Sequence, residues 1–369
     1  MKSEWQTKKI GEVVDIRRGS SPRPIHKFLA TEGMPWVKIA DATSDTSRYI
    51  WKTNEFIIED GMTKSVKVAP ETLIVSNSAT PGLPKIMKIT ACVHDGWLVF
   101  SNYRGITRDF LYYKFIDIRR TLVNQANGSV FQNLKTDIVK DFDIDIPCIE
   151  TQKKIVGILS QIDEKIELNN AINNNLEQQT QAIFDSMFPN ISNGENTIGD
   201  TITPKRGKGL LSKNAVFGNV PVVAGGLEPS TYHNTANTKA PVLAISASGA
   251  NAGFVSLWNI PIWSSDSSFI DSSMTDDVYF WYVLLKKRQR EIYDSQTGSA
   301  QPHIYPQHIA AMPISDLNFD DVRNYTSIVT PIFEMIGHNK DENARLATTR
   351  DTLLPKLMSG ELDVSDIEI

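Results

Sequence analysis

The chain has 369 residues, of which 41% are hydrophobic and 22% are charged. This composition is typical of folded globular proteins and excludes a disordered chain, while the length predicts two domains rather than one. The net charge is −5 and long basic runs are absent, so phosphate attraction alone would give only modest affinity for nucleic acid.

The cysteines and the N-terminal segment indicate the cellular compartment. Cys92 and Cys148 are the two cysteines, and they lack paired spacing. A disulfide framework and a zinc site are therefore not supported, and we expect a reduced, cytoplasmic protein. Residues 1–10 have charged side chains and no apolar core, unlike a signal peptide. The uncharged stretch 240–265 contains Pro and Gly with many Ser and Asn, so it predicts buried β structure rather than a membrane span.

The first half of the chain predicts a globule followed by a long helix. Residues 1–147 contain short β-branched and aromatic runs between Gly, Pro, Asn and Ser, which is typical of irregular β structure. Within them, residues 109–123 have apolar residues at helical spacing. Residues 148–190 predict one sustained helix from Glu150 to Phe188, which Pro189 ends.

The second half predicts the same succession. Residues 191–320 form a second globule with a helix over 278–293, and residues 321–369 contain a second long helix from about 321 to 358. Pro331 should kink this helix or mark a second start within it. The segments 1–150, 151–196, 197–320 and 321–369 have net charges of +3, −3, −1 and −4, so most of the acidity lies in the two helical segments.

The two halves repeat one another. The run beginning Ile10-Gly11-Glu12 and ending at Gly19 returns 188 positions later, from Ile198 to Gly207. Gly128-Ser129 returns as Gly298-Ser299, and apolar positions of the first long helix return 170 positions later in the second. A period this long indicates a duplicated domain rather than a solenoid. Pseudo-two-fold symmetry is then expected, which suits a bipartite target such as two half-sites on duplex DNA.

Each long helix has a narrow apolar stripe with a polar middle. A stripe on a helix of about 38 residues, roughly 57 Å long, needs a partner, and the other copy packed antiparallel is the nearest candidate. The pair would act as a rigid spacer between the globules. The asparagines in the stripes either specify register in the core of the pair or face water. They are Asn169, Asn170, Asn173, Asn174 and Asn175 in the first helix, with Asn339 and Asn343 in the second.

Signatures of catalysis and of cofactor binding are missing. Gly207-Lys208-Gly209 lacks the ending of a phosphate loop, and Gly225-Gly226 does not extend to a dinucleotide-binding loop. The six histidines are scattered without metal-ligand spacing. His94 and Asp95 could form a catalytic fragment, although Asp266 is its only counterpart in the second copy. The sequence therefore predicts no catalytic residue, no metal and no cofactor.

With these residues considered, the chain resembles the specificity subunit of type I restriction–modification systems. The resemblance rests on the Ile-Gly-Glu-Val-Val opening at 10–14, Asn-Gly-Ser at 127–129 with its Thr-Gly-Ser twin at 297–299, and the run from Glu150 to Val156 that begins the first helix. The ending Leu354-Pro355-Lys356-Leu357-Met358-Ser359-Gly360-Glu361-Leu362 also matches. The second copy departs from the pattern, because Val322-Arg323-Asn324 replaces the Gln-Lys-Lys run there, which could make methylation-subunit contact unequal at the two helices.

The resemblance implies an α+β chain with two duplicated mixed α/β target-recognition domains and two long helices packed as an antiparallel coiled coil. It implies a non-enzymatic subunit that chooses the DNA sequence, each recognition domain reading one half of a split site. The implied partners are double-stranded DNA, two methylation subunits that would bind S-adenosylmethionine and, for cleavage, restriction subunits, with no membrane. The helices would set the spacer between half-sites and dock the methylation subunits.

Candidate DNA contacts are donor-rich side chains in loops beside glycine, because glycine lets the backbone approach phosphate. In the first copy they are Arg17, Arg18, Ser20, Arg23, Lys27, Ser76, Asn77, Ser78, Asn127, Ser129, Gln132, Asn133 and Lys135. In the second copy they are Lys205, Arg206, Lys208, Lys213, Ser246, Ser248, Gln296, Ser299, Gln301, His303 and Tyr305. The alternative for the Gly-Ser and Ser-x-Ser turns is a purely structural role as caps and connections.

Two other functions stay open at this point. A self-contained nucleic-acid enzyme would reveal itself by methyl transfer from the purified chain alone. A duplicated scaffold or ligand-binding module, whose two copies serve avidity, would not shift duplex DNA in a mobility assay.

Overall fold

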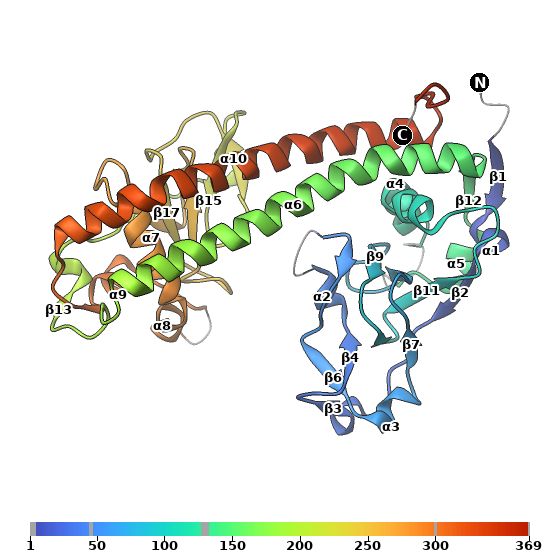
Figure 1. Cartoon of the computed structure of the whole chain (residues 1–369), viewed down its shortest axis with the longest axis horizontal. Coiled ribbons are helices and arrows are strands. Elements are labelled where there is room, and N and C mark those ends of the chain that lie inside the picture. Colours follow the sequence, from blue (N-terminus) through green and yellow to red (C-terminus); the bar gives the residue numbers. More distant parts are fainter. Residues whose placement is uncertain (1–4, 44–46, 127–132, 299–300, 368–369) are drawn as a thin grey trace. The chain divides into compact units, whose positions relative to one another are not determined.

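The computed structural model describes residues 5–43, 47–126, 133–298 and 301–367 (Figure 1). Contacts divide the chain into two compact units, a first unit of residues 1–167 with 343–369 and a second unit of residues 168–342. There are two long helices, α6 (Ile149–Met187) and α10 (Phe319–Met358). Each helix has one part in the first unit and the other part in the second unit. None of the described helices is both long and apolar enough to span a membrane.

The first unit contains two five-stranded sheets and one two-stranded ribbon. In the central sheet the order is β2 (Asp15–Arg18), β11 (Trp97–Ser101), β8 (Leu73–Ser76), β9 (Pro84–Met87) and β5 (Tyr49–Ile50). In the outer sheet it is β3 (Leu29–Ala30), β6 (Glu55–Ile57), β4 (Met34–Val37), β10 (Ala91–Val93) and β7 (Val66–Val68). The ribbon pairs β1 (Gln6–Lys9) antiparallel with β12 (Asp143–Ile146).

The second unit contains smaller versions of the same three sheets. Its central sheet has the order β14 (Lys205–Arg206), β20 (Ser267–Asp271), β17 (Val242–Ser246) and β18 (Val255–Trp258). Its outer sheet has the order β16 (Thr231–His233), β15 (Val220–Val223) and β19 (Trp263–Ser264). The ribbon pairs β13 (Asn196–Thr197) with β21 (Pro313–Ile314).

Strand register confirms the duplication. Arg18 lies opposite Leu98 in the first unit, and Arg206 lies opposite Ser268 in the second. Leu98 and Ser268 are 170 positions apart in the sequence, so the two arginines pair with equivalent positions of the neighbouring strand. Each outer sheet also has one parallel pair, β4 with β10 and β15 with β19. The first unit adds edge strands and the short helix α3 (Glu59–Met62), which have no counterpart among the described elements of the second unit.

Shorter helices complete each unit. The first has α1 (Ile10–Val13), η2 (Ile25–Lys27), α2 (Ile39–Thr43), α4 (Arg108–Ala126) and α5 (Thr136–Asp141). The second has η3 (Ile198–Asp200), η4 (Ser212–Asn214), α7 (Val278–Lys287), α8 (Gln289–Asp294) and α9 (Pro306–Ala310). The single helix predicted over 278–293 is wrong in one respect, because it breaks at Arg288. That side chain is buried and donates to the carbonyl of Pro313, 2.6 Å away, and to Glu291.

The cores explain why the apolar runs of the sequence form these layers. In the first unit α4 packs on the central sheet, with Phe115 edge-on to Phe100 of β11 at a ring distance of 5.1 Å. In the second unit Phe184 of α6, Phe280 of α7 and Tyr325 of α10 form a buried aromatic cluster. Apolar faces of both long helices therefore belong to the cores of the units.

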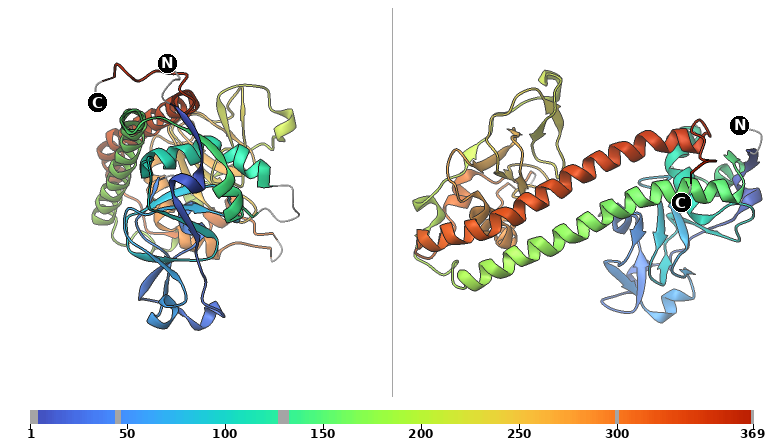
Figure 2. Two further views of the ribbon diagram at one scale, coloured as in Figure 1. Left: turned by 90° about the vertical axis from the view of Figure 1, so that its right-hand side faces the viewer. Right: turned by 45° about the horizontal axis from the view of Figure 1, so that its top comes forward.

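The two long helices pack antiparallel within each unit, as predicted (Figures 1 and 2). Asp163 of α6 contacts Arg350 of α10 in the first unit, and Asn173 contacts Asn339 in the second, so residue numbers fall along one helix as they rise along the other. Helix α10 runs unbroken through Pro331, which excludes a second helix start there.

The asparagines divide between the two roles left open by the sequence. Asn169 and Asn173 are buried in the helix pair, where Asn169 donates to Glu342 at 2.7 Å and Asn173 accepts from Asn339 at 2.8 Å. The other three asparagines of the first helix have exposed side chains: Asn170, Asn174 and Asn175. Only part of the polar middle can therefore specify register.

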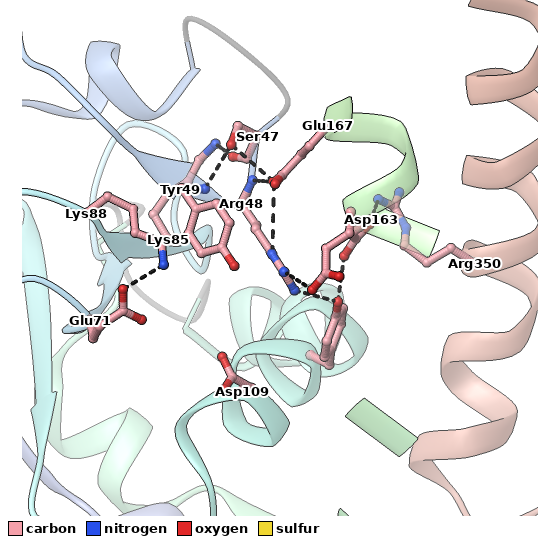
Figure 3. Close-up of polar contacts among 12 residues, drawn as sticks. Ser47, Arg48, Tyr49, Glu71, Lys85, Lys88, Asp109, Asp163, Glu167 and Arg350 are labelled. Atoms are coloured by element: carbon pink, nitrogen blue, oxygen red, sulfur yellow. Dashed lines mark hydrogen bonds and ion pairs between the residues drawn. The ribbon is translucent and has the colours of Figure 1, made fainter. Parts of the chain in front are cut away.

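A charged cluster holds the helices together in the first unit (Figure 3). Asp163 accepts from Arg350 at 2.9 Å and from the hydroxyl of Tyr113 at 2.7 Å. Arg48, 6% exposed, donates to Tyr113 and to Glu164. Burial opposes the charge of Arg48, but Tyr113, Glu167 and Glu164 around it hold its pKa above the ordinary value.

Candidate nucleic-acid interface

The turn after β2 brings basic side chains to one end of the central sheet. Gly19 donates its N–H to the carbonyl of Trp97 at 2.8 Å, and a Cβ at this position would lie 2.1 Å from the carbonyl oxygen of His94. Gly207 donates likewise to Ser267 at 2.8 Å, and its Cβ would lie 2.5 Å from the carbonyl oxygen of Ser264. A side chain at either position would therefore clash with the chain's own backbone, which explains the glycine in both copies.

Asp95 gathers the polar side chains of this turn in the first unit. Its Oδ1 accepts from Ser21 at 2.5 Å, its Oδ2 lies 3.2 Å from Nη2 of Arg23, and its carbonyl accepts from Nε of Arg18 at 2.7 Å. Burial would raise the pKa of Asp95, but the Ser21 hydrogen bond and the charge of Arg23 hold it below its ordinary value. The side chains of Arg18 and Arg23 remain 56% and 75% exposed, so they can reach a ligand while Asp95 fixes their direction.

Asp266 plays the same part in the second unit. It lies 2.6 Å from Nη2 of Arg206 and accepts from the hydroxyl of Ser248. Sequence spacing could not reveal these contacts, since Arg18 and Asp95 are 77 positions apart and Arg206 and Asp266 are 60 apart. The only signal was the presence of an acid near the start of the same strand in both copies.

His94 does not form the catalytic fragment considered from the sequence. Its Nδ1 accepts the backbone N–H of Gly96 at 2.6 Å and lies 3.9 Å from Asp95 Oδ1, beyond hydrogen-bond range. Burial lowers the pKa of His94 below its ordinary value, despite the nearby carboxylate of Asp95. The imidazole therefore caps a turn.

Three of the proposed DNA contacts face inward. Ser76 donates to the carbonyl of Thr80 at 2.5 Å, and Asn77 donates to the carbonyl of Asp95 at 3.0 Å. Ser76, Asn77 and Ser246 are at most 3% exposed. Their prediction as DNA contacts is wrong, because these side chains are buried at the sheet end. Ser78 and Ser248 of the same turns are half-buried and stay candidates.

The segments around 133 and 303 return to these turns. Leu134 donates its N–H to the carbonyl of Asn77 at 2.8 Å, and Ile304 donates to the equivalent Ala247 at 2.9 Å. His303 forms β-bridges with Ser248 and Thr297, and its ring stacks on Tyr305 at 5.9 Å. Asn133 and Gln301 are exposed, whereas Gln296 donates to the carbonyl of Ala252. Four predicted contacts lie outside the described residues: Asn127, Ser129, Gln132 and Ser299.

The other basic candidates are exposed and, within the described part of the chain, take part in no ion pair: Arg17, Lys27, Lys135, Lys205, Lys208 and Lys213. Arg17 donates to the carbonyl of Lys67 at 3.2 Å, and Ser20 donates to that of Lys64 at 2.9 Å. Lys27 and Lys213 lie on η2 and η4.

The described residues contain no group of three or more His, Cys, Asp or Glu side chains arranged to hold a metal ion. The arrangement at each sheet end consists of fixed arginines, free cations and hydroxyls. Such donors bind phosphate oxygens and base edges.

Comparison with known proteins agrees with this chemistry. Residues 2–178 match the family model of the type I restriction modification DNA specificity domain. The chain is 25% identical to the type I restriction enzyme MjaIX specificity subunit of Methanocaldococcus jannaschii, over 99% of this chain and 95% of that protein. It is 22% identical to a type I specificity subunit of Mycoplasma pneumoniae, over 96% of both. The solved S subunit of a type I restriction–modification system from M. genitalium shares the fold, with a TM-score of 0.59, 19% identity and 96% of both chains covered.

Proposed function

We propose that the chain is a specificity subunit of a type I restriction–modification system, which selects the DNA sequence and leaves the chemistry to other subunits, and that each unit reads one half of a bipartite site. The observation that carries this proposal is the repeated arginine–aspartate pair, Arg18 with Asp95 and Arg206 with Asp266, at equivalent ends of the two central sheets. A duplicated reader suits a target with two half-sites.

We assign different tasks to the two kinds of cation at these sheet ends. Arg18 and Arg206 have a fixed direction, which bidentate recognition of a guanine edge requires. Arg17, Lys205 and Lys208 have no acidic partner among the described residues, so they suit phosphate contacts, which position the protein without reading sequence. Ser78, Ser248, His303 and Tyr305 lie near the fixed arginines or on the returning segments and complete the proposed surface.

The proposed partners are duplex DNA, two methylation subunits that bind S-adenosylmethionine and, for cleavage, restriction subunits, all in the cytoplasm. Exposed apolar side chains on the outer faces of the long helices suit methylation-subunit docking: Leu168 and Ile172 on α6, with Ile328 and Met335 on α10. Methylation of adenine requires a flipped base in a catalytic pocket, which the methylation subunit would supply.

A mobility shift on duplex DNA, with and without methylation subunits, tests the proposal. We expect site-preferring binding by the complex, at a site first identified by mapping methylated positions in the host genome. Methyl transfer by this chain alone, at the rate of the complex, would contradict a purely reading role. Absence of any DNA binding by the complex would favour the duplicated scaffold or ligand-binding module instead.

A further inference from the structure

The second unit presents an uncovered aromatic side chain beside its basic turn. Phe217 is 97% exposed, although it follows the short helix η4 in a loop that is firmly attached. The next residue, Gly218, packs so closely that a Cβ there would lie 2.4 Å from the carbonyl oxygen of His233. The backbone on both sides of Phe217 is therefore held in place, and covering its exposed ring by a partner would be favourable.

A chain of contacts ties this loop to the basic turn. Val216 donates its N–H to Nδ1 of His233 at 3.0 Å, and the His233 ring lies edge-on to Trp263 at 5.0 Å. Trp263 in turn donates from its indole to the carbonyl of Lys208 at 2.8 Å. Phe217 is therefore positioned relative to Lys208 by packed side chains rather than by a free loop.

The surroundings of Phe217 favour a polyanion. Residues 205–232 contain four basic residues and one acidic residue, Glu228. Lys208 and Lys213 are exposed and form no ion pair within the described residues. Beside the ring is a hollow of about 570 Å³ lined by Tyr232, itself 53% exposed, together with Ser212, Asn219 and Thr231. An exposed aromatic ring in a segment rich in cations without acidic partners suits nucleic acid better than a protein surface or a membrane interior.

In the first unit the residue 188 positions before Phe217 is Leu29, which is smaller and 40% exposed, and the phenylalanine beside it is covered. Phe28 also follows a short helix, η2, but it is 8% exposed, packs against Gly61 of α3 and lies 4.4 Å under the ammonium of Lys64. The second unit lacks a described counterpart of α3, so its phenylalanine stays bare.

We propose that Phe217 is an apolar wedge that inserts at a base step of the second half-site, with Lys208 and Lys213 on the flanking phosphates. Apolar side chains that enter between base pairs unstack them and kink the duplex. Such a wedge makes the second unit sensitive to the deformability of that step, so it contributes specificity without a base hydrogen bond. This inference rests on the proposed function, because it requires that the second unit contact duplex DNA.

The test uses the complex with its methylation subunits and a duplex carrying the mapped site. 2-Aminopurine, whose fluorescence rises on unstacking, replaces one base of the second half-site at a time. We expect the native complex to raise the signal at the adenine that the methylation subunit flips and, because of the wedge, at one further step. Phe217→Ala should abolish the rise at this further step and weaken binding about ten- to hundred-fold, the range for loss of one aromatic–base contact.

Matched variants separate the wedge from other effects. Phe217→Leu should keep part of the fluorescence rise, because a leucine can still enter a base step. Leu227→Ala removes another exposed apolar side chain of the same unit and should change neither binding nor fluorescence. If the Phe217→Ala complex binds DNA as tightly as the native complex and shows the same fluorescence rise, the wedge proposal is wrong.

Two further outcomes identify what has failed. If Phe217→Ala loses the methylation subunits while the duplex signal of the assembled fraction is unchanged, the ring contacts protein and the wedge is wrong. If the native complex itself shows no site-preferring DNA binding, the proposed function fails before the wedge is tested.

Discussion

The two units share a strand order but hold their helices with different chemistry. In the first unit the buried contact between α6 and α10 is ionic, built on Asp163 and Arg350 with Arg48 and Tyr113 around it. In the second unit it is an amide pair, Asn173 with Asn339, beside an aromatic cluster. Because a buried charge and a buried amide cannot exchange partners without cost, the two contacts together specify one antiparallel register.

The entrances of the two helices differ in the same way. Gln152 of α6 is fully buried, and its side chain binds the carbonyls of Gly105 and Pro147 and the N–H of Thr107. The residue 170 positions later is Val322, also buried. The glutamine of the Gln-Lys-Lys run therefore satisfies a loop of its own unit, so its absence from the second copy reflects a different local structure rather than a missing docking residue.

Register gives the prediction with the largest expected effect. The two polar contacts lie on either side of a stretch of each helix, so four residues inserted in α6 alone would separate Asp163 from Arg350 or Asn173 from Asn339. Four residues added to both helices, after Ile166 and after Glu342, would keep both contacts and lengthen the pair by about 6 Å. We expect the matched insertion to widen the unread spacer by one or two base pairs, since steps are about 3.4 Å.

The spectrum of methylated sites measures this effect. A two-residue insertion in both helices, which rotates the stripe by roughly 200° at 3.6 residues per turn, is the control and should abolish assembly. An assembled four-residue variant that methylates sites with the native spacer would show that the helices do not set the distance.

The ionic contact should matter more to stability than the amide contact. Asp163→Ala removes the acceptor of the Tyr113 hydroxyl and leaves Arg350 with the exposed Asp351 as its remaining acidic partner, which should cost about 2 kcal/mol. Asn173→Ala loses one neutral hydrogen bond and should cost about 1 kcal/mol. Amide hydrogen exchange measured over a series of urea concentrations reports the free energy of unfolding of each unit separately. If both variants lost the same free energy of unfolding, the ionic contact would not be the more stabilising of the two.

Arg18 and Arg206, which have an acidic partner, and Arg17, which has none among the described residues, give a smaller but sharper comparison. Arg18→Ala or Arg206→Ala should cost about 1–3 kcal/mol at one base position and relax the preference there, if each reads a base. Arg17→Ala, at the adjacent position, should weaken binding to all sequences alike and lower the salt slope by about one.

Positioning by the aspartates is tested by Asp95→Asn and Asp266→Asn. Each should relax the preference of its own half-site while leaving the number of phosphate contacts, and hence the salt slope, nearly unchanged. If Arg18→Ala instead lowers the salt slope without altering preference, Arg18 is a phosphate contact. No change in either quantity would exclude it from the interface.

Much of the fold follows from the sequence, because the duplication and the apolar stripes are periodic. The long helices, their antiparallel pairing and the repeat of the sheet follow from such patterns. The break at Arg288 does not, since the buried contact of that side chain with the carbonyl of Pro313 joins residues that a helical pattern cannot relate. The burial of Asn169 and Asn173 beside exposed Asn170 likewise depends on which face the partner helix covers.

The candidate interface was predictable only in part. Basic residues next to Gly19 and Gly207 could be found because both copies carry them. The roles of Asp95 and Asp266 depend on strand pairing across 60 positions or more, and the inward direction of Ser76 and Asn77 depends on the turn geometry. Phe217 gave no sequence signal, because its exposure depends on which of the described elements lie around it.

The central claim is that the two units read DNA independently, and one exchange tests it directly. Residues 1–147 are replaced by the corresponding segment of another specificity subunit that keeps equivalents of Arg48 and Tyr113, so that the contacts to Asp163 survive. The methylated sites of the complex containing the chimera are then mapped genome-wide. We predict that one half-site changes while the other half-site and the spacer stay as in the native complex. A chimera that assembles and methylates but alters both half-sites, or neither, would contradict the account.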